Sequence, residues 1–284
     1  MIAWLITPFT YAFMSRGLFA AVMVGILCSV VGCYVVLRSM AFLGDAMAHA
    51  ILPGIAIAYL LKGNLTIGAL VAAIVLAVAI GAFSQRGIIK EDTAIGILFT
   101  AALALGVALI SSISTYAVDL SHILFGNVLG VSPADLWLTG LLGAAVLITT
   151  FICYKPFLVI SFDPILASTL KLPVQALRIL LLVLLALTIV ISMQTVGVGL
   201  VAAMLVTPGA TAYLLTKRLP AMMALSALFG ALSSIIGLYA SYYLNIASGS
   251  TIVLTATLFF ILAFLFSPRK GVLKNLFKSN PTGK

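Results

Sequence analysis

The sequence contains few charged residues. Only 7% of its 284 residues are Asp, Glu, Lys or Arg, whereas a soluble domain carries about 25%. Acidic residues are the rarest of these, with six Asp and Glu in total. So few charges exclude a soluble domain of any size. The hydrophobic share of 64% and the mean hydropathy of +1.31 instead indicate an integral membrane protein.

Other absent motifs exclude further classes of function. The sequence has no G-x-x-x-x-G-K-[ST] nucleotide loop, so any ATP used for transport must be bound by another chain. Its three cysteines, Cys28, Cys33 and Cys153, form neither a disulfide framework nor a zinc pattern. The net charge of +9 comes from short loops and the tail. It therefore indicates membrane orientation and not binding to nucleic acid.

Long apolar runs predict an all-α polytopic membrane protein, because each run of about 20 residues is long enough to span the bilayer as a helix. The seventh run contains Pro208 and several glycines, so eight spans are an alternative to nine. We expect a permease domain at 1–268 and a basic cytoplasmic tail at 269–284 that lies against anionic lipid. The predicted spans are 17–37, 41–61, 65–84, 93–115, 132–152, 174–192, 195–215, 221–243 and 251–267.

The basic residues predict the orientation of the nine spans. With the N-terminus outside, only Arg16 and Lys62 remain on the outer face. Positive residues favour the cytoplasmic side, so we expect a multi-pass plasma-membrane protein with a cytoplasmic C-terminus. The residues placed inside are Arg38, Arg86, Lys90, Lys155, Lys171, Arg178, Lys217, Arg218, Arg269, Lys270, Lys274, Lys278 and Lys284.

The second span carries two ionisable residues, Asp45 and His49. An ionisable residue in a span costs roughly 2.5–3.5 kcal/mol, so it indicates a function. The i, i+4 spacing places both side chains on one helix face. Pro53 leaves the carbonyl of His49 without its usual partner, and we expect helix breaks near the path at Pro53 and Pro208. The carboxylate, imidazole and carbonyl are possible ligands for a divalent cation.

A second signal lies between spans five and six, where residues 163–172 read as a short cytoplasmic helix. Asp163 is a good N-cap and Pro164 suits the first turn, while Pro173 discourages continuation beyond Lys171. We expect the small residues Ala167 and Ser168 on its surface, which suits docking into a groove of a soluble partner. A simple loop helix is the alternative.

The remaining acidic residues have local interpretations. Glu91 and Asp92 open the fourth span, where acids complement a helix N-terminus. Asp135 follows Ser132-Pro133 and reads as a cap. Asp119 lies three residues before His122 in the loop at 116–131, and the pair is either solvated or in contact with a metal or an external partner.

Several segments together resemble a known family. They are LRSMAFLGDAMAHAILPGIAIA, EDTAIGILFTAALALG, DLSHILFGNVLG, SFDPILASTLKLP and QTVGVGLVAAMLVTPGATAYLL. In this order they resemble the membrane permease subunit of bacterial ABC importers for manganese, zinc or iron, the ABC-3 family, with the manganese branch most similar. The resemblance implies a type II ABC importer-like fold and a transport subunit without an enzymatic activity of its own. It implies no permanently bound cofactor, only a transported divalent metal.

The resemblance also implies partners and site residues. The partners are a second copy of the chain, two cytoplasmic ATPase subunits and an extracytoplasmic metal-binding protein. Asp45 and His49 match the residues that contact the passing metal. The loop helix matches the family's coupling helix, which seats in the ATPase, and its residues here are Asp163, Pro164, Ala167, Ser168, Leu170, Lys171 and Pro173.

Alternatives to metal import by an ABC complex remain at this stage. An Asp–His pair in a membrane is also a proton relay, which would suit a proton-coupled secondary transporter. An intramembrane metal-dependent enzyme would need more ligands, and Asp45 is the only acid well inside a span. Asp45 and His49 could also pair only with each other or with a neighbouring helix. The cargo could be Zn²⁺ or Fe²⁺ in place of Mn²⁺.

Overall fold

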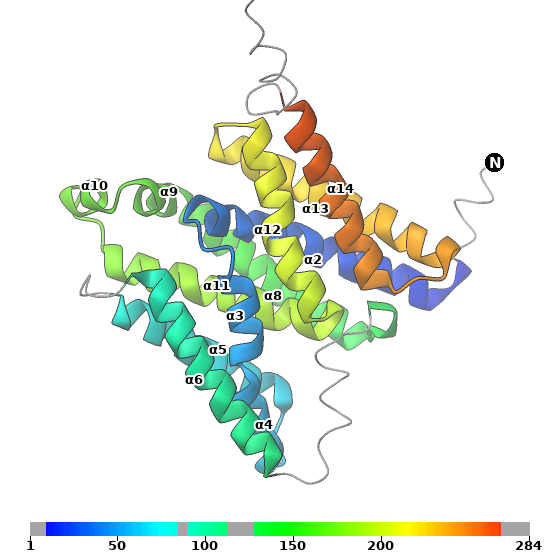
Figure 1. The fold of residues 1–284 in the computed structure, drawn as a ribbon, viewed down its shortest axis with the longest axis horizontal. Coiled ribbons are helices and arrows are strands. Elements are labelled where there is room, and N and C mark those ends of the chain that lie inside the picture. The colour runs from blue at the N-terminus through cyan, green and yellow to red at the C-terminus, as the bar shows by residue number, and fades with distance from the viewer. Residues whose placement is uncertain (1–9, 85–89, 113–127, 268–284) are drawn as a thin grey trace, which may run out of the picture.

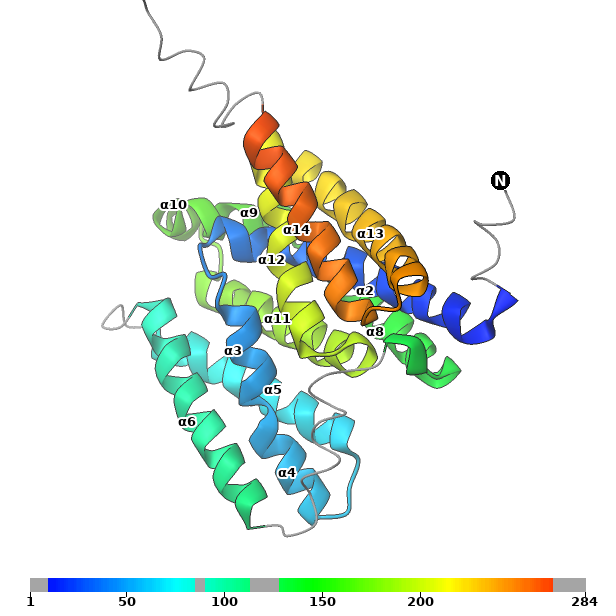
Figure 2. The same cartoon turned by 45° about the vertical axis from the view of Figure 1, so that its right-hand side comes forward.

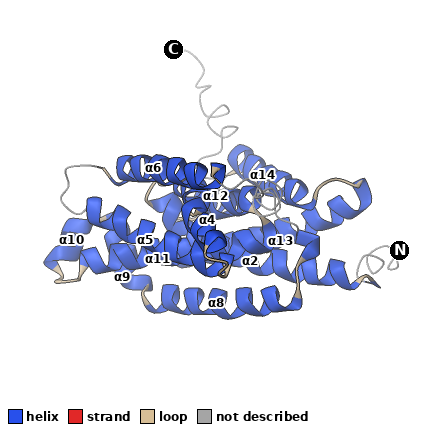
Figure 3. Ribbon diagram, turned by 90° about the horizontal axis from the view of Figure 1, so that it is seen from below, coloured by secondary structure: helices blue, strands red, loops and turns tan. Residues whose placement is uncertain are grey.

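The computed structural model describes residues 10–84, 90–112 and 128–267. These residues form helices joined by loops (Figure 3). In chain order the helices are α2 (Ala12–Leu37), α3 (Leu43–Ala50), α4 (Leu52–Leu60), α5 (Leu65–Phe83), α6 (Glu91–Ser111), the 3₁₀ helix η2 (Val128–Gly130), α8 (Pro133–Ile152), α9 (Tyr154–Phe162), α10 (Pro164–Thr169), α11 (Val174–Val196), α12 (Val198–Leu215), α13 (Leu219–Leu244) and α14 (Ser248–Phe266).

Nine helical segments of the described chain are long and apolar enough to cross a membrane, with Leu43–Leu60 counted as one. The predicted number of spans is thereby confirmed for the described residues, including the seventh, which is α12. The first span begins at Ala12 and not at residue 17, because its apolar pattern tolerates the single charge of Arg16. The predicted tail at 269–284 lies outside the described residues.

The spans form two groups with α3 and α11 between them (Figures 1 and 2). In one group α2 packs against α12 and α13, and α14 covers both of these partners. In the other group α4 packs against α5 and α6. Helix α11 contacts α5 in the second group and α2 in the first, and α3 contacts both α6 and α12. The short helix α3 therefore lies between the two groups.

Glycines allow close approach of helix backbones at two points. A Cβ atom on Gly32 of α2 would overlap the backbone carbonyl of Leu205 on α12. Likewise, a Cβ on Gly54 of α4 would overlap the carbonyl of Gly68 on α5. Membrane helices associate through small residues of this kind because lipid provides no hydrophobic force between them.

Buried hydroxyl groups add hydrogen bonds between the helices of the first group. Ser226 Oγ on α13 donates to the carbonyl of Ser29 on α2 at 2.8 Å. Ser234 Oγ on α13 donates to the carbonyl of Ala21 on α2 at 2.9 Å. Such bonds contribute about 0.6 kcal/mol each on average in a membrane protein. The α2–α13 pair is therefore held by specific polar contacts as well as by packing.

Candidate functional site

The two ionisable residues of the second span lie together on α3. His49 Nε2 is 3.7 Å from Asp45 Oδ1, which is too long for a hydrogen bond. Asp45 occupies the first turn of the helix, where a carboxylate is favourable relative to the helix dipole, and His49 lies in the last turn. Because neither side chain is hydrogen-bonded to the other, both retain donor atoms for a ligand.

Both side chains are partly exposed on the surface of the single chain. The exposed fraction is 46% for the Asp45 side chain and 34% for His49, whereas Leu43, Ala46 and Met47 of the same helix are buried. A carboxylate of a spanning segment that faced acyl chains would be costly. This face of α3 must therefore meet water or another protein surface.

Two side chains alone are too few for a metal coordination shell. No group of three or more His, Cys, Asp or Glu residues comes together in the described part of the chain. Divalent metals in proteins take at least four ligands, and hard cations take six or more. Within the described residues, Asp45 and His49 are therefore too few to form a complete metal site.

The helix is interrupted directly after the pair. Helix α3 ends at Ala50 and α4 begins at Leu52, with Ile51 between them, so the expected interruption near Pro53 is present. Pro53 lies in the first turn of α4 and is buried. It has no N–H group, so it cannot donate to the carbonyl of His49. The carbonyl of His49 accepts instead from the backbone N–H of Ile51.

The expected helix break at Pro208 is wrong. Helix α12 runs continuously from Val198 to Leu215 with Pro208 inside it. Membrane helices tolerate proline where neighbouring groups compensate for the lost hydrogen bond. Here Gly209 follows directly and lies against Gly32 of α2, so the helix is packed firmly on both sides of the proline.

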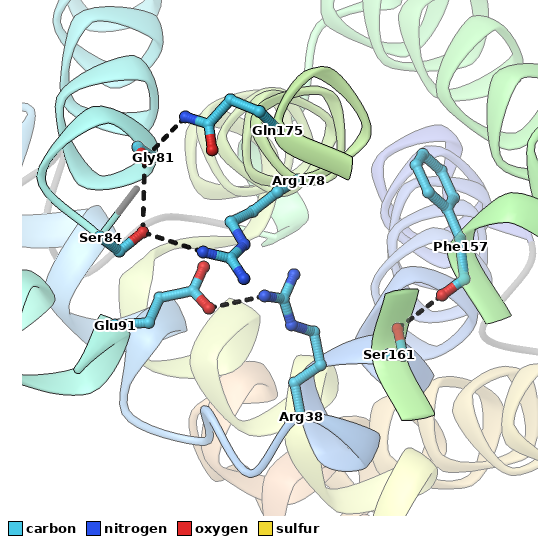
Figure 4. A network of polar contacts seen from close by, with 8 residues as sticks. All are labelled: Arg38, Gly81, Ser84, Glu91, Phe157, Ser161, Gln175 and Arg178. Carbon is cyan, nitrogen blue, oxygen red and sulfur yellow. Dashed lines mark hydrogen bonds and ion pairs between the residues drawn. The ribbon is translucent and has the colours of Figure 1, made fainter. Parts of the chain in front are cut away.

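A buried ion pair lies where α2 ends and α6 begins (Figure 4). Arg38 Nη2 donates to Glu91 Oε2 at 2.6 Å, and the two side chains are 9% and 16% exposed. Sequence reasoning treated Glu91 as a helix-start acid and missed this partner, which is 53 residues away. The available signal was that Glu91 and Arg38 both lie at the predicted cytoplasmic ends of spans.

Two further helices join the same cluster (Figure 4). Arg178 Nη1 on α11 donates to Ser84 Oγ at 3.5 Å, and Gln175 Nε2 donates to the carbonyl of Gly81 on α5 at 3.0 Å. Burial lowers the pKa of the Arg38 guanidinium, as does the neighbouring charge of Arg178, and Glu91 acts in the opposite sense. The cluster ties four helices together at one end of the bundle.

The predicted loop helix is present as α10, which follows α9 directly. Asp163 Oδ1 accepts from the backbone N–H groups of Ile165 at 3.0 Å and Leu166 at 2.9 Å, so the predicted N-cap is confirmed. Pro164 occupies the first turn as expected. The helix ends at Thr169, earlier than predicted, because Lys171 has a left-handed backbone with φ of 55°.

The prediction that Ala167 lies on the surface of this helix is wrong. Ala167 is completely buried, whereas Ser168 is exposed as expected. A helix this short must pack one side against the protein, and a methyl group permits that contact. The apolar side chains that point outward are Ile165, Leu166 and Leu170, with exposed fractions of 79%, 48% and 56%.

In the described part of the chain, Asp135 makes its hydrogen bonds at the start of its own helix. Ser132 and Asp135 form a reciprocal capping box at the start of α8, with Asp135 N donating to Ser132 Oγ at 3.2 Å. This confirms the predicted cap. Asp119 and His122 lie outside the described residues, so their two interpretations stay open.

Known proteins resemble the chain over nearly its full length. The manganese transport system membrane protein MntC of Halalkalibacterium halodurans is 52% identical over 264 residues, which are 93% of this chain and 90% of that protein. MntC of Listeria monocytogenes is 49% identical over 263 residues, covering 93% of this chain and 94% of that one. The chelated iron transport system membrane protein YfeD of Yersinia pestis is 40% identical, and the match covers 93% of this chain and 89% of that protein.

Solved structures agree with the helical architecture. A chain of PsaBC from Streptococcus pneumoniae in complex with Fab has a TM-score of 0.83, 43% identity, and coverage of 97% of this chain and 100% of that one. A structure described as a metal-chelate type ABC transporter in an inward-facing conformation has a TM-score of 0.72 at 15% identity, covering 88% and 85%. The second likeness shows the fold alone.

The family model named ABC 3 transport family matches residues 10–267, which include the α3 pair, the ion pair and helix α10. The segments that suggested this family from the sequence lie within that range. The chain is thus a multi-pass membrane protein of a bacterial transport system, and it belongs to the ABC 3 transport family.

Proposed function

We propose that this chain is the membrane permease subunit of an ATP-driven importer that moves a divalent metal cation, with Mn²⁺ as its preferred cargo. The proposal rests chiefly on the pair of Asp45 and His49, which is partly exposed within a spanning segment. Relatives named as manganese transport proteins support Mn²⁺. The relative named for chelated iron makes Fe²⁺ the second candidate.

A second copy of the chain would complete the site. Two copies that meet across the exposed face of α3 would bring together two carboxylates and two imidazoles from Asp45 and His49. This set of oxygen and nitrogen donors suits Mn²⁺, Fe²⁺ or Zn²⁺. Zn²⁺ binds such sites more tightly than Mn²⁺, so selection of manganese would require geometry or prior selection by an extracytoplasmic metal-binding protein.

The site would bind the ion transiently along its transport path and would not hold it permanently. The carbonyl of His49 accepts from the Ile51 N–H and receives no bond from Pro53, so its second lone pair would be left for an ion beside the pair. An ion that enters from the outside would exchange water for these donors and leave again toward the cytoplasm. The partial exposure of both side chains is consistent with such transient binding, because ligands that enclose an ion completely release it slowly.

Charge distribution supports an orientation with the N-terminus outside. Among the described residues, Arg16 and Lys62 lie at one end of the spans. The other described basic residues lie at the opposite end, which would face the cytoplasm, and they are Arg38, Lys90, Lys155, Lys171, Arg178, Lys217 and Arg218.

In this orientation α10 would face the cytoplasm and dock on an ATPase subunit. The outward side chains Ile165, Leu166 and Leu170 form an apolar surface that a soluble partner could cover. Two ATPase subunits would serve two permease copies. Their closure upon ATP binding would push both α10 helices and alternate the side to which the Asp45–His49 site is open.

Competitive uptake tests the proposal. The full complex, with its ATPase and metal-binding protein, is reconstituted in vesicles, and radioactive Mn²⁺ uptake is measured against unlabelled Mn²⁺, Zn²⁺ and Fe²⁺. We expect uptake that requires ATP hydrolysis and that Mn²⁺ competes best. Uptake that follows a proton gradient and ignores ATP would refute the ABC mechanism. Stronger competition by Fe²⁺ or Zn²⁺ at equal free concentration would change the cargo and leave the mechanism in place.

A further inference from the structure

A long groove runs along α2 on the side of the bundle formed by α8 and α13. It consists of two adjoining cavities of about 540 and 460 Å³. Both cavities are lined by Tyr154 and Pro220, so they adjoin at these residues. Along α2 the lining runs from Leu37 to Ile26. At 1.5 Å per residue this is about 17 Å, which is close to the depth of one leaflet of a hydrocarbon core about 30 Å thick.

The two ends of the groove differ in chemistry. Its mouth carries Lys217 and Arg218, which are exposed in the loop between α12 and α13. Its deeper part is lined by apolar side chains that include Val30, Leu147 and Phe151. No acidic residue is among the described residues that line either cavity. The groove therefore has positive side chains at its surface end and apolar side chains at its deeper end.

We propose that this groove binds an anionic glycerophospholipid of the inner leaflet, with its phosphate against Lys217 and Arg218 and one acyl chain along α2. The assignment to the inner leaflet uses the orientation given under the proposed function. Anionic headgroups are attracted to basic residues at the cytoplasmic surface. Long basic side chains reach such headgroups while their carbon stems stay in apolar surroundings.

Competing occupants fit the groove less well. Helix α8 lies on the opposite side of the bundle from α6 (Figure 3), and α6 packs against the α3 helix that carries the metal pair. A second copy that completed that pair would leave the groove open. A soluble ATPase cannot reach the deep end, since Ile26 and Val30 lie within a membrane-spanning helix.

Photo-crosslinking of the complete transport complex in nanodiscs tests the site. Phosphatidylglycerol and phosphatidylcholine with a photoreactive acyl chain are compared, and labelled peptides are identified by mass spectrometry. We expect phosphatidylglycerol to label α2 and the first half of α13 several-fold more than phosphatidylcholine does. The double variant K217Q/R218Q should reduce this labelling about tenfold or more, because each basic residue near the surface contributes to the attraction of anionic lipid.

Two further variants make the result specific. R16Q/K62Q removes the same charge from the other end of the spans and should leave the labelling unchanged. Ala224 is exposed and lines the apolar part, so Ala224→Trp should block the acyl chain and lower labelling while Lys217 and Arg218 remain.

Several results would overturn the lipid site. These are equal labelling by both lipids, labelling spread over all lipid-facing helices, or full labelling of K217Q/R218Q. Crosslinks from groove residues to the ATPase would assign the surface to a protein partner and overturn it as well. The readout is lipid binding, so it is independent of whether the complex transports manganese.

Discussion

The Arg38 guanidinium donates to the Glu91 carboxylate at 2.6 Å and joins the end of α2 to the first residue of α6. Helix α3 begins five residues after Arg38 and packs against α6. The ion pair therefore holds the segment that leads into α3 close to the start of α6. Through this connection, a contact elsewhere in the bundle influences the position of Asp45 and His49.

Removing one partner of this ion pair should destabilise the protein strongly. Glu91→Gln leaves the Arg38 charge buried without a counterion, which costs about 3–5 kcal/mol. The double variant R38Q/E91Q removes both charges and should recover much of this loss. Thermal unfolding in detergent measures both. Equal stability of Glu91→Gln and wild type would show that the pair is solvated and does not hold the helices.

Asp45→Asn and His49→Ala should each abolish metal uptake and leave assembly intact. Changes in residues behind metal ligands already cost about 10–100-fold in affinity, so loss of a direct donor should cost at least as much. Thr100→Ala on α6 is the control, since its hydroxyl bonds only to the carbonyl of Gly96 in its own helix. Uptake of Mn²⁺ at wild-type rates in either site variant would remove the metal site.

The exposed face of α3 should lie between two copies of the chain. Asp45→Cys, placed in a background with Cys153→Ser, should form a dimer with a short bifunctional maleimide, and gel electrophoresis detects it. The remaining native thiols, Cys28 and Cys33, are buried. Trp137 is 81% exposed on α8, which lies on the opposite side of the bundle from α6 (Figure 3). The Trp137→Cys variant should therefore stay monomeric. A dimer through residue 137 in place of 45 would reverse the proposed interface.

Ile165→Ser should uncouple ATP hydrolysis from transport. The side chain is 79% exposed on α10, so its loss should not unfold the permease. Burial of an isoleucine contributes about 1.5–3 kcal/mol, and docking of the ATPase should weaken accordingly. The number of metal ions moved per ATP should fall. Thr169→Ser, at the end of the same helix, is the control, and an unchanged ratio in Ile165→Ser would place the ATPase elsewhere.

Gly32→Ala should disrupt the contact between α2 and α12. Its methyl group would overlap the Leu205 carbonyl, and overpacking of this kind costs about 1–3 kcal/mol or more. Gly199→Ala is the matched control because a Cβ there meets no atom within 4 Å. Thermal unfolding should separate the two variants clearly. Similar unfolding temperatures would mean that the α2–α12 contact is looser than described.

Local features of this fold were predictable from the sequence. Each span follows from a continuous apolar run, and the α3 pair follows from the spacing of Asp45 and His49. The caps at Asp163 and Asp135 also depend only on neighbouring residues. Such signals need no knowledge of how the helices pack.

Contacts between distant segments were not predictable in this way. The sequence marks Arg38 and Glu91 as charged span ends, but their pairing depends on how α2 and α6 are placed. The burial of Ala167 depends on which side of α10 rests on the protein. Helix α12 continues through Pro208 because its neighbours hold it. In each case tertiary packing, which a single sequence does not display, decided the outcome.

The position of α3 has a mechanical consequence. It touches α6 on one side and α12 on the other, so it lies on the seam between two separately packed halves. When one half slides or tilts against the other, the side chains on that seam change their surroundings first. A small movement of one group of helices against the other would therefore change the surroundings of Asp45 and His49.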